Sequence, residues 1–165
     1  MKEIFERVSV RQYAQEPVPD EMVTRLLKAA MAAPSARNAQ PWEFIVVKDR
    51  QMLKKMSVVS DYTHMLEYAG AGFVVLGDLR ISEKEYILQD CSAAVENLLL
   101  EAESLGLGGC WLGVCPRQSR METVRELFEL PEHILPVCLV SVGFPEKKPA
   151  PKEKFDERKV HYERY

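Results

Sequence analysis

Two arginines and a serine alternate near the start of the chain, in the segment Arg7-Val8-Ser9-Val10-Arg11. In an extended segment every second side chain points to the same side, so Arg7, Ser9 and Arg11 are expected to share a face. Two guanidinium groups and a hydroxyl on one face suit a phosphate or another ligand rich in oxygen atoms. The simpler alternative is two surface arginines near a helix terminus, and the segment taken alone favours that alternative.

A polar loop bracketed by prolines extends from Pro34 to Trp42 and reads PSARNAQPW. Its prolines restrict the backbone, which lowers the entropy lost when the loop orders around a ligand. Ser, Asn and Gln side chains supply polar groups, and Trp42 supplies a large aromatic surface. The alternative is a helix-to-strand connection in which Trp42 belongs to the core, and the two interpretations are compatible.

A third segment, from Gly106 to Gly113, is rich in glycine and reads GLGGCWLG. The dinucleotide fingerprint GxGxxG does not fit, because Trp111 stands at its third glycine position and a predicted helix, not a strand, precedes the segment. Glycines here instead allow the backbone to approach a flat ligand closely, with its N–H groups available as donors.

The remaining residue types give little support to metal or nucleophilic chemistry. The cysteines form no C-x-x-C pair and have apolar neighbours, so we expect small buried thiols. The histidines are far apart in the sequence, which makes a metal site improbable, and no Ser/His/Asp triad can be read from the sequence. The residues concerned are Cys91, Cys110, Cys115, Cys138, His64, His133 and His161.

Length and composition describe an ordinary globular protein. The chain has 165 residues, 47% of them hydrophobic and 28% charged, which indicates a single domain, residues 1–165. A net charge of −3 argues against nucleic acid as the main partner, since binding to a phosphate backbone needs a basic face. The N-terminus is charged where a signal peptide is apolar, and four acids interrupt the apolar stretch from Ile87 to Leu107. A cytoplasmic protein without a membrane partner is therefore expected.

Helical and strand patterns interleave along the chain without a regular βαβ order, which predicts an α+β layered fold around a central sheet. The long helix carries an apolar stripe wide enough to pack in the core or against a partner subunit, and Gly106 is its expected stop. Residues from Phe144 onward lack a core pattern. The expected helices are Glu3–Val8, Asp20–Ala33, Asp49–Met56, Ser82–Leu105 and Met121–Phe128, and the expected strands are Glu43–Val47, Gly72–Leu76, Cys110–Val114 and Val137–Gly143.

In their order and separation these segments resemble the nitroreductase family of flavoproteins along nearly the whole chain. Further points of resemblance are Gln89-Asp90 on the long helix, the pair Lys152 and Lys154, and the tail Phe155–Tyr165. The resemblance implies a layered fold with a central mixed, largely antiparallel sheet flanked by helices. It also implies a domain-swapped homodimer with one FMN per interface, in which residues 144–165 form a C-terminal arm that embraces the partner subunit.

The resemblance also implies a role for each site residue. Arg7 and Ser9 hold the phosphate or ribityl chain together with Lys152 and Lys154, and Arg11 reaches the ribityl chain or the pyrimidine edge. The backbone of Trp111, Leu112 and Gly113 lines the flavin edge near N5. The other subunit contributes Pro34, Ser35, Ala36 and Asn38. No catalytic side chain and no metal is required, because the flavin carries the chemistry.

By resemblance the protein is an FMN-dependent oxidoreductase that takes hydride from NAD(P)H and passes it to an electron-poor acceptor, such as a nitroaromatic or a quinone, in a ping-pong cycle. One alternative is a flavoenzyme of the same fold with other chemistry, such as reductive dehalogenation, enone reduction or flavin destruction. The other alternative is a non-catalytic FMN carrier or sensor. Neither the physiological substrate nor the choice between NADH and NADPH follows from the sequence.

One departure concerns the middle of the chain. Larger relatives carry an Asn-x-x-Lys pair whose lysine lies near the flavin pyrimidine, but the segment Tyr62–Gly70 holds no lysine. Arg11 is the expected replacement for that positive charge. The proton for the acceptor comes from solvent or from a pocket residue such as Tyr62 or His64.

Overall fold

A four-stranded antiparallel sheet, in the order β1-β2-β4-β3, forms the centre of the computed structural model, which describes residues 2–165. Every residue of the two central strands is buried, which explains why their sequences are almost continuously apolar. The pairings within this sheet are all antiparallel, and an isolated bridge between Ser9 and Gly109 adds a parallel contact at its edge. The strands are β1 (Trp42–Val47), β2 (Ala71–Asp78), β3 (Gly108–Gly113) and β4 (Ile134–Gly143).

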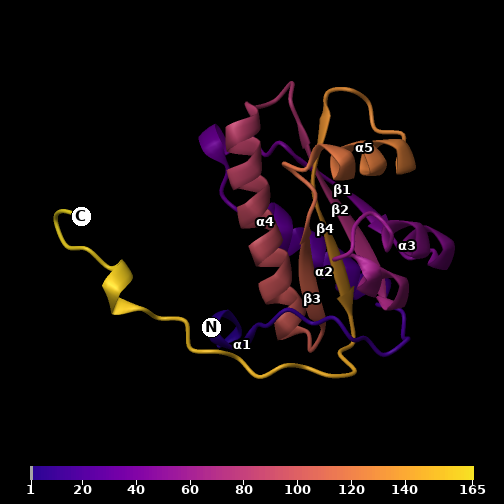
Figure 1. The fold of residues 1–165 in the computed structure, drawn as a ribbon, viewed down its shortest axis with the longest axis horizontal. Helices are drawn as coiled ribbons and strands as arrows, with labels where there is room; N and C mark the ends of the chain where they lie inside the picture. The colour runs from indigo at the N-terminus through magenta and orange to yellow at the C-terminus, as the bar shows by residue number, and fades with distance from the viewer. Residues whose placement is uncertain (1) are drawn as a thin grey trace.

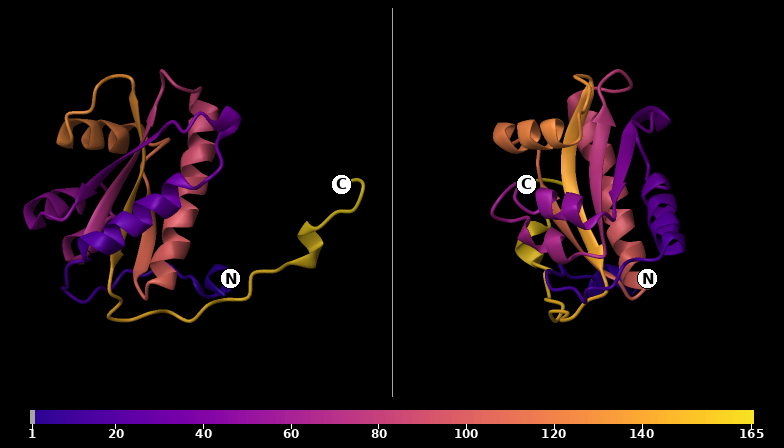
Figure 2. Two further views of the ribbon diagram at one scale, coloured as in Figure 1. Left: turned by 180° about the vertical axis from the view of Figure 1, so that it is seen from behind. Right: turned by 90° about the vertical axis from the view of Figure 1, so that its right-hand side faces the viewer.

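Helices cover both faces of the sheet, so the molecule has three layers (Figures 1 and 2). The helices α2 (Asp20–Met31) and α4 (Lys84–Ser104) lie on one face, and α3 (Arg50–Met56) and α5 (Gln118–Leu127) lie on the other. A short helix α1 (Glu3–Glu6) precedes them, and the 3-10 turns are η1 (Ala36–Asn38), η2 (His64–Tyr68) and η3 (Glu157–Lys159). The layered α+β fold expected from the sequence is therefore confirmed.

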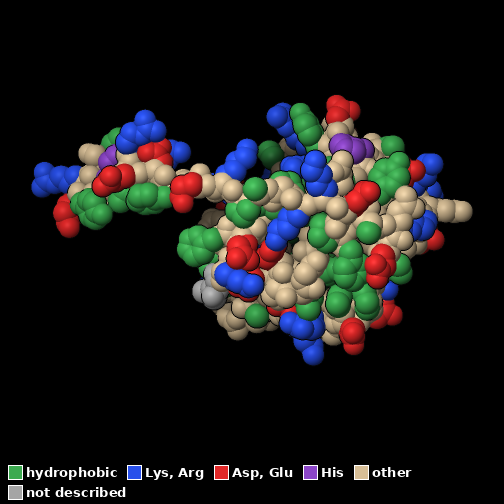
Figure 3. All heavy atoms as spheres, turned by 90° about the horizontal axis from the view of Figure 1, so that it is seen from below, with side chains coloured by type: hydrophobic (Ala, Val, Ile, Leu, Met, Phe, Trp, Pro, Cys, Tyr) green, Lys and Arg blue, Asp and Glu red, His purple; other side chains and the backbone are tan. Residues whose placement is uncertain are grey.

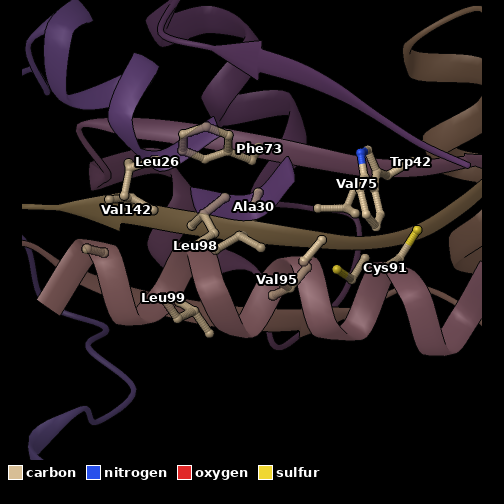
Figure 4. Packing of buried hydrophobic residues seen from close by; sticks show 14 of the residues in the cluster. Leu26, Ala30, Trp42, Phe73, Val75, Cys91, Val95, Leu98, Leu99 and Val142 are labelled. Atoms are coloured by element: carbon tan, nitrogen blue, oxygen red, sulfur yellow. The ribbon is translucent and has the colours of Figure 1, made fainter. Parts of the chain in front are cut away.

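Alternating residues of the central strands belong to two separate apolar clusters, one on each face of the sheet. Phe73 and Val75 point toward α2 and α4, where they pack with Leu26 and Leu98 (Figure 4). Their neighbours Val74 and Leu76 join the cluster on the opposite face. Complete burial of such a side chain stabilises the fold by about 1.5–3 kcal/mol. Trp42 also belongs to the first cluster, which confirms its interpretation as a core residue.

The wide apolar stripe of α4 is largely buried within the chain itself. The helix packs against α2 and against the strands of the sheet, so the core accounts for the stripe without a second subunit. The helix ends as expected at Gly106, whose φ of +73° suits glycine, and the N–H of Leu107 donates to the Ala102 carbonyl at 2.9 Å. The buried residues of α4 are Ile87, Asp90, Cys91, Ala94, Val95, Leu98, Leu99 and Ala102.

Several expected element boundaries were wrong. The first helix stops at Glu6 instead of Val8, because the next residues run along the edge of β3, where the Val10 N–H donates to the Gly109 carbonyl at 3.0 Å. Strand β3 begins at Gly108, two residues earlier than predicted, because Gly108 already pairs with Gly143 of β4. Helix α5 begins at Gln118 instead of Met121. The 3-10 turns were not predicted.

The C-terminal residues leave the body as an extended arm (Figure 1). Its first residues contact the core: the N–H of Glu146 donates to the Gln12 carbonyl at 3.0 Å, and Lys148 pairs with Glu103. Farther along the arm, the side chains of Phe155 and Tyr162 are exposed. The expectation that residues from Phe144 onward lack a core pattern is wrong for Phe144 itself, which packs against the first cluster, and it agrees with the exposed side chains farther along the arm. Within residues 2–165, no helix has both the length and the apolarity to cross a bilayer.

Candidate functional site

A cavity of about 650 Å³ opens between the N-terminal segment and the C-terminal arm. Figure 3 shows this side of the molecule, with the arm leaving the body and basic side chains interspersed with acidic ones near it. Four cationic side chains line the cavity against one carboxylate, that of Glu153, so the cavity favours an anion. The predicted site residues that the structure brings together here are Arg7, Ser9, Arg11, Lys152 and Lys154.

The segment that carries Arg7, Ser9 and Arg11 is fixed to the edge of the sheet. Ser9 forms the parallel bridge to Gly109, and the side chain of Val10 is fully buried. The Arg7 guanidinium is additionally oriented by Glu96 on α4, with 3.2 Å between Nε and Oε1. Its side chain is 20% exposed, so the guanidinium is partly shielded from solvent at the cavity.

Tyr13 ties the same segment to the central strand β4. Its hydroxyl lies 2.7 Å from the Val10 carbonyl and 2.8 Å from the Ser141 hydroxyl, and the side chain is buried. Burial raises the pKa of Tyr13 far above its ordinary value, and the hydrogen bond with Ser141 opposes that rise. Tyr13 is therefore a neutral structural group at neutral pH.

A second cavity, of about 310 Å³, adjoins Arg11 on the other side. Arg11 lines both cavities, and the second is also lined by the three predicted backbone positions on β3. Arg11 therefore lies between the cationic cavity and the cavity beside the β3 residues. The lining residues are Arg11, Tyr62, His64, Met65, Trp111, Leu112, Gly113 and Arg120.

The glycines of β3 do not share one role. A Cβ at Gly108 would lie 2.5 Å from the Val10 side chain, and one at Gly109 would lie 2.6 Å from Leu99, so packing requires both glycines. Only at Gly113 is the space open, with no atom within 4 Å of such a Cβ. The expectation that this stretch lets a ligand approach the backbone stays a prediction, for which the structure leaves space at Gly113, whereas the first two glycines serve the fold.

Arg120 is a candidate site residue that the sequence analysis missed. Its Nη1 donates to the Gly113 carbonyl at 2.8 Å, and its guanidinium lies 5.6 Å from the centre of the Tyr62 ring. An arginine on the polar helix α5 belongs to no motif, so no signal in the sequence marked it. Within residues 2–165, neither Arg11 nor Arg120 forms an ion pair with a carboxylate.

The proline-bracketed loop lies apart from both cavities, near the start of α4, whereas α1 and the arm lie toward its other end (Figure 1). The Ala36 N–H donates to Asp90 at 3.0 Å, and the Gln40 N–H donates to the Ser35 hydroxyl at 2.9 Å. Three loop residues have positive φ, a costly conformation outside glycine, and they are Arg37, Asn38 and Gln40. One chain therefore does not bring Pro34, Ser35, Ala36 and Asn38 to its own cavities.

Three of the four thiols are buried as expected, and Cys115 is only half-buried. Burial raises the pKa of Cys91 to about 12 and that of Cys138 well above its ordinary value. Burial also raises the pKa of Cys110. A thiol must ionise to act as a nucleophile, so these three side chains do not have that role.

Comparisons with known proteins agree with this architecture. The nitroreductase family model matches residues 4–62 and 67–144. A candidate NADH dehydrogenase/NAD(P)H nitroreductase of Archaeoglobus fulgidus is 45% identical over 170 positions, which cover 100% of this chain and 98% of that protein. A crystal structure of a Bacteroides thetaiotaomicron protein with the same name is 46% identical, with a TM-score of 0.95 over 99% of this chain and 96% of that one.

A third relative was solved with a cofactor. A candidate nitroreductase of Desulfovibrio desulfuricans, crystallised in complex with FMN, is 27% identical, with a TM-score of 0.86 over 99% of this chain and 96% of that one. Together with the match along almost the whole sequence, these likenesses settle the family. This chain belongs to the nitroreductase family.

Proposed function

We propose that this protein is an FMN-dependent oxidoreductase that takes hydride from NAD(P)H and passes it to an electron-poor small molecule, such as a nitroaromatic or a quinone, in a ping-pong cycle. The observation that carries the proposal is the pair of cavities that meet at Arg11. One is cationic, and the other borders open backbone at Gly113. The FMN complex of the Desulfovibrio desulfuricans relative supports the choice of cofactor.

The residues of the first cavity fit a phosphate monoester. Guanidinium and ammonium groups form charge-assisted hydrogen bonds with phosphate, and the Ser9 hydroxyl adds a neutral donor. Arg7, Ser9, Lys152 and Lys154 hold the FMN phosphate and the adjoining ribityl chain in this proposal. Glu96 restrains Arg7, which lowers the entropy lost when the cofactor binds.

The residues of the second cavity fit the edge of a flat ring. The open space at Gly113 lets a ring approach the backbone of Trp111, Leu112 and Gly113. When bound, FMN supplies the hydride acceptor and donor atom N5, chemistry that no side chain of this protein can supply.

Two guanidinium groups in this cavity take the place of the mid-chain lysine of larger relatives. Arg11 and Arg120 both line it, and each is free of a carboxylate partner within residues 2–165. Positive charge beside the pyrimidine edge stabilises the anionic reduced cofactor and thereby raises its reduction potential. Tyr62 and His64 line the same cavity, which supports either of them as the proton donor in this proposal.

A homodimer completes the site in this proposal. The loop with Pro34, Ser35, Ala36 and Asn38 lies apart from the cavities of its own chain, so its flavin contacts are made in the partner subunit. The arm from residue 144 to 165 exposes large apolar side chains that a partner surface can cover. Light scattering of the full chain tests the dimer, and a stable FMN-loaded monomer at low micromolar concentration contradicts it.

Initial-rate kinetics test the proposed reaction. With NADH or NADPH and either menadione or a nitroaromatic varied together, a ping-pong cycle gives parallel lines in double-reciprocal plots. Intersecting lines indicate that both substrates bind before hydride moves, which contradicts the cycle. FMN binding without turnover of a broad acceptor panel points to a carrier or sensor. Turnover confined to enones or halogenated phenols points to a flavoenzyme with other chemistry.

A further inference from the structure

The two walls of the first cavity are attached to the body of the protein in different ways. One wall is the N-terminal segment, in which the Val10 N–H donates to the Gly109 carbonyl and the Tyr13 hydroxyl lies 2.8 Å from that of Ser141. The other wall is the part of the arm from residue 149 to 155, and every residue of it is exposed. The first wall is therefore fixed to the sheet, whereas the second buries little surface that could hold it in place.

Within residues 2–165, the polar contacts that tie the arm to the body all come before this second wall. The last hydrogen bond to the body is that of the Glu146 N–H, and the last ion pair with the body is that of Lys148. The hydrogen bonds and ion pairs farther along join arm residues to one another, for example those from the N–H groups of Lys154 and Phe155 to Glu153. Residues 149–155 are therefore held from one end.

Like charges line both walls of the cavity. Arg7 and Arg11 lie on the N-terminal segment, Lys152 and Lys154 lie on the arm, and Glu153 is the one carboxylate among the described lining residues. Because like charges repel, an empty cavity favours separation of the two walls. A phosphate monoester carries a charge of about −1.5 to −2, so its binding between the walls converts this repulsion into attraction.

Prolines couple this wall to the rest of the arm. Pro145, Pro149 and Pro151 restrict the backbone, and proline-rich segments act as semi-rigid spacers. Residues 156–165 follow directly and expose the large side chains of Tyr162 and Tyr165. The position of this exposed end therefore depends on whether residues 149–155 lie against the N-terminal segment.

We propose that residues 149–155 are a strap that closes over the first cavity around a phosphate-bearing ligand and opens without one, and that closure directs residues 156–165 toward the partner subunit. The proposal rests on the function proposed above and concerns the regulation of its cofactor site. In that function one chain supplies the phosphate contacts, through Arg7, Ser9, Lys152 and Lys154. The arm is the wall that is free to move, so it transmits the effect of the phosphate group to the dimer.

Hydrogen exchange of the full chain, followed by mass spectrometry, measures closure at the amides of residues 152–155. FMN is compared with riboflavin, which has the same ring and ribityl chain but no phosphate, and inorganic phosphate is compared with chloride at equal ionic strength. We expect FMN to slow exchange by roughly tenfold or more, phosphate to slow it less, and riboflavin and chloride to leave it nearly unchanged. Sedimentation should give a dimer dissociation constant that is lower by roughly fivefold or more with FMN than with riboflavin.

A double variant, Lys152→Gln with Lys154→Gln, tests the arm side of the cavity. With FMN kept saturating, it should lose both the slowed exchange and the tighter dimer. Lys147→Gln is the matched control, because Lys147 is an exposed lysine of the same arm that does not line the cavity. This control should behave as the wild type does in both measurements.

Exchange that FMN and riboflavin slow equally overturns the proposal, as does slowed exchange that survives in the double variant. Equal dimer affinity with the two flavins also overturns it. If FMN binds, as its altered visible absorbance shows, and residues 152–155 exchange as fast as before, the strap is refuted and the proposed function stands. If phosphate slows exchange through the two lysines but NAD(P)H does not reduce bound FMN, the strap is supported and the proposed function is refuted.

Discussion

The carboxylate of Asp90, on α4, accepts a hydrogen bond from the backbone N–H of Ala36, with 3.0 Å between Oδ1 and N. Asp90 is buried, and its second oxygen has no hydrogen-bond partner within residues 2–165. The bond is the link between the long helix and a loop in which Arg37, Asn38 and Gln40 all have positive φ. Such conformations persist only where the surroundings enforce them, so Asp90 is a positioning residue for this loop.

Removing that carboxylate should loosen the loop. Asp90→Ala leaves the Ala36 N–H without its acceptor and should reduce the free energy of unfolding by about 1–3 kcal/mol. Asp90→Asn keeps an acceptor oxygen and should cost less. Thermal unfolding measures both variants, with the exposed Glu85→Ala on the same helix as control. A melting temperature of Asp90→Ala equal to that of the control would show that the bond does not hold the loop.

The Tyr13 hydroxyl should contribute to stability and to the geometry of the first cavity. Tyr13→Phe removes the hydrogen bonds to the Val10 carbonyl and the Ser141 hydroxyl and should cost about 1–2 kcal/mol. The FMN affinity should weaken at the same time, because the segment with Arg7 and Ser9 is fixed through this contact. Urea denaturation and FMN titration check the two effects. Tyr68→Phe, whose ring is half-exposed, is the control and should change neither.

Substitution of the two arginines of the N-terminal segment, Arg7 and Arg11, should have different effects on the flavin. Arg7→Ala removes a positive charge that balances the negative charge of the FMN phosphate, so FMN affinity should fall by roughly tenfold to more than a hundredfold. The rate of hydride transfer should change little once FMN is saturating. Arg11→Ala should slow reduction and lower the flavin potential. Arg25→Ala, which removes a surface ion pair with Glu101, is the control. If Arg7→Ala binds FMN with the same affinity as the parent protein, the assignment of Arg7 to the FMN phosphate is wrong.

The ion pair between Asp78 and Arg80 should contribute to acid stability. Hydrogen bonds from Arg80, the shortest at 2.6 Å between Nη2 and Oδ2, lower the pKa of Asp78 from 3.8 to about 2. A lowered pKa in the folded state means that the contribution is present above the ordinary pKa and is lost as the pH falls toward about 2. Melting temperatures from about pH 6 to about pH 2 should therefore fall more steeply for the wild type than for Asp78→Asn. Equal slopes would contradict the assignment.

Local patterns were sufficient for the helices and strands of the fold, but not for all of their boundaries or for the 3-10 turns. The apolar runs at Gly72–Leu76 and Val137–Gly143 marked the two central strands, because a strand buried on both faces needs apolar residues throughout. The periodicity before Gly106 marked α4 and its end. Each of these features depends on neighbouring residues only, so a single sequence carries it.

Features that depend on distant partners could not be predicted in this way. Gly108 is needed because Val10 fills the space beside it, and those residues are about a hundred positions apart. Arg120 enters the second cavity through a bond to Gly113, a contact that no spacing encodes. The positive φ values of Arg37 and Asn38 likewise follow from tertiary contacts around the loop.

Anaerobic reduction of the bound cofactor tests the central claim most directly. The purified protein, saturated with FMN and freed of oxygen, is mixed with NADH or NADPH while its visible absorbance is followed. We predict that one or both nicotinamides bleach the flavin and that a nitroaromatic or menadione, added after the nicotinamide is removed, restores the colour. A protein that binds no FMN, or whose bound FMN keeps its oxidised spectrum with excess of both nicotinamides, would contradict the account.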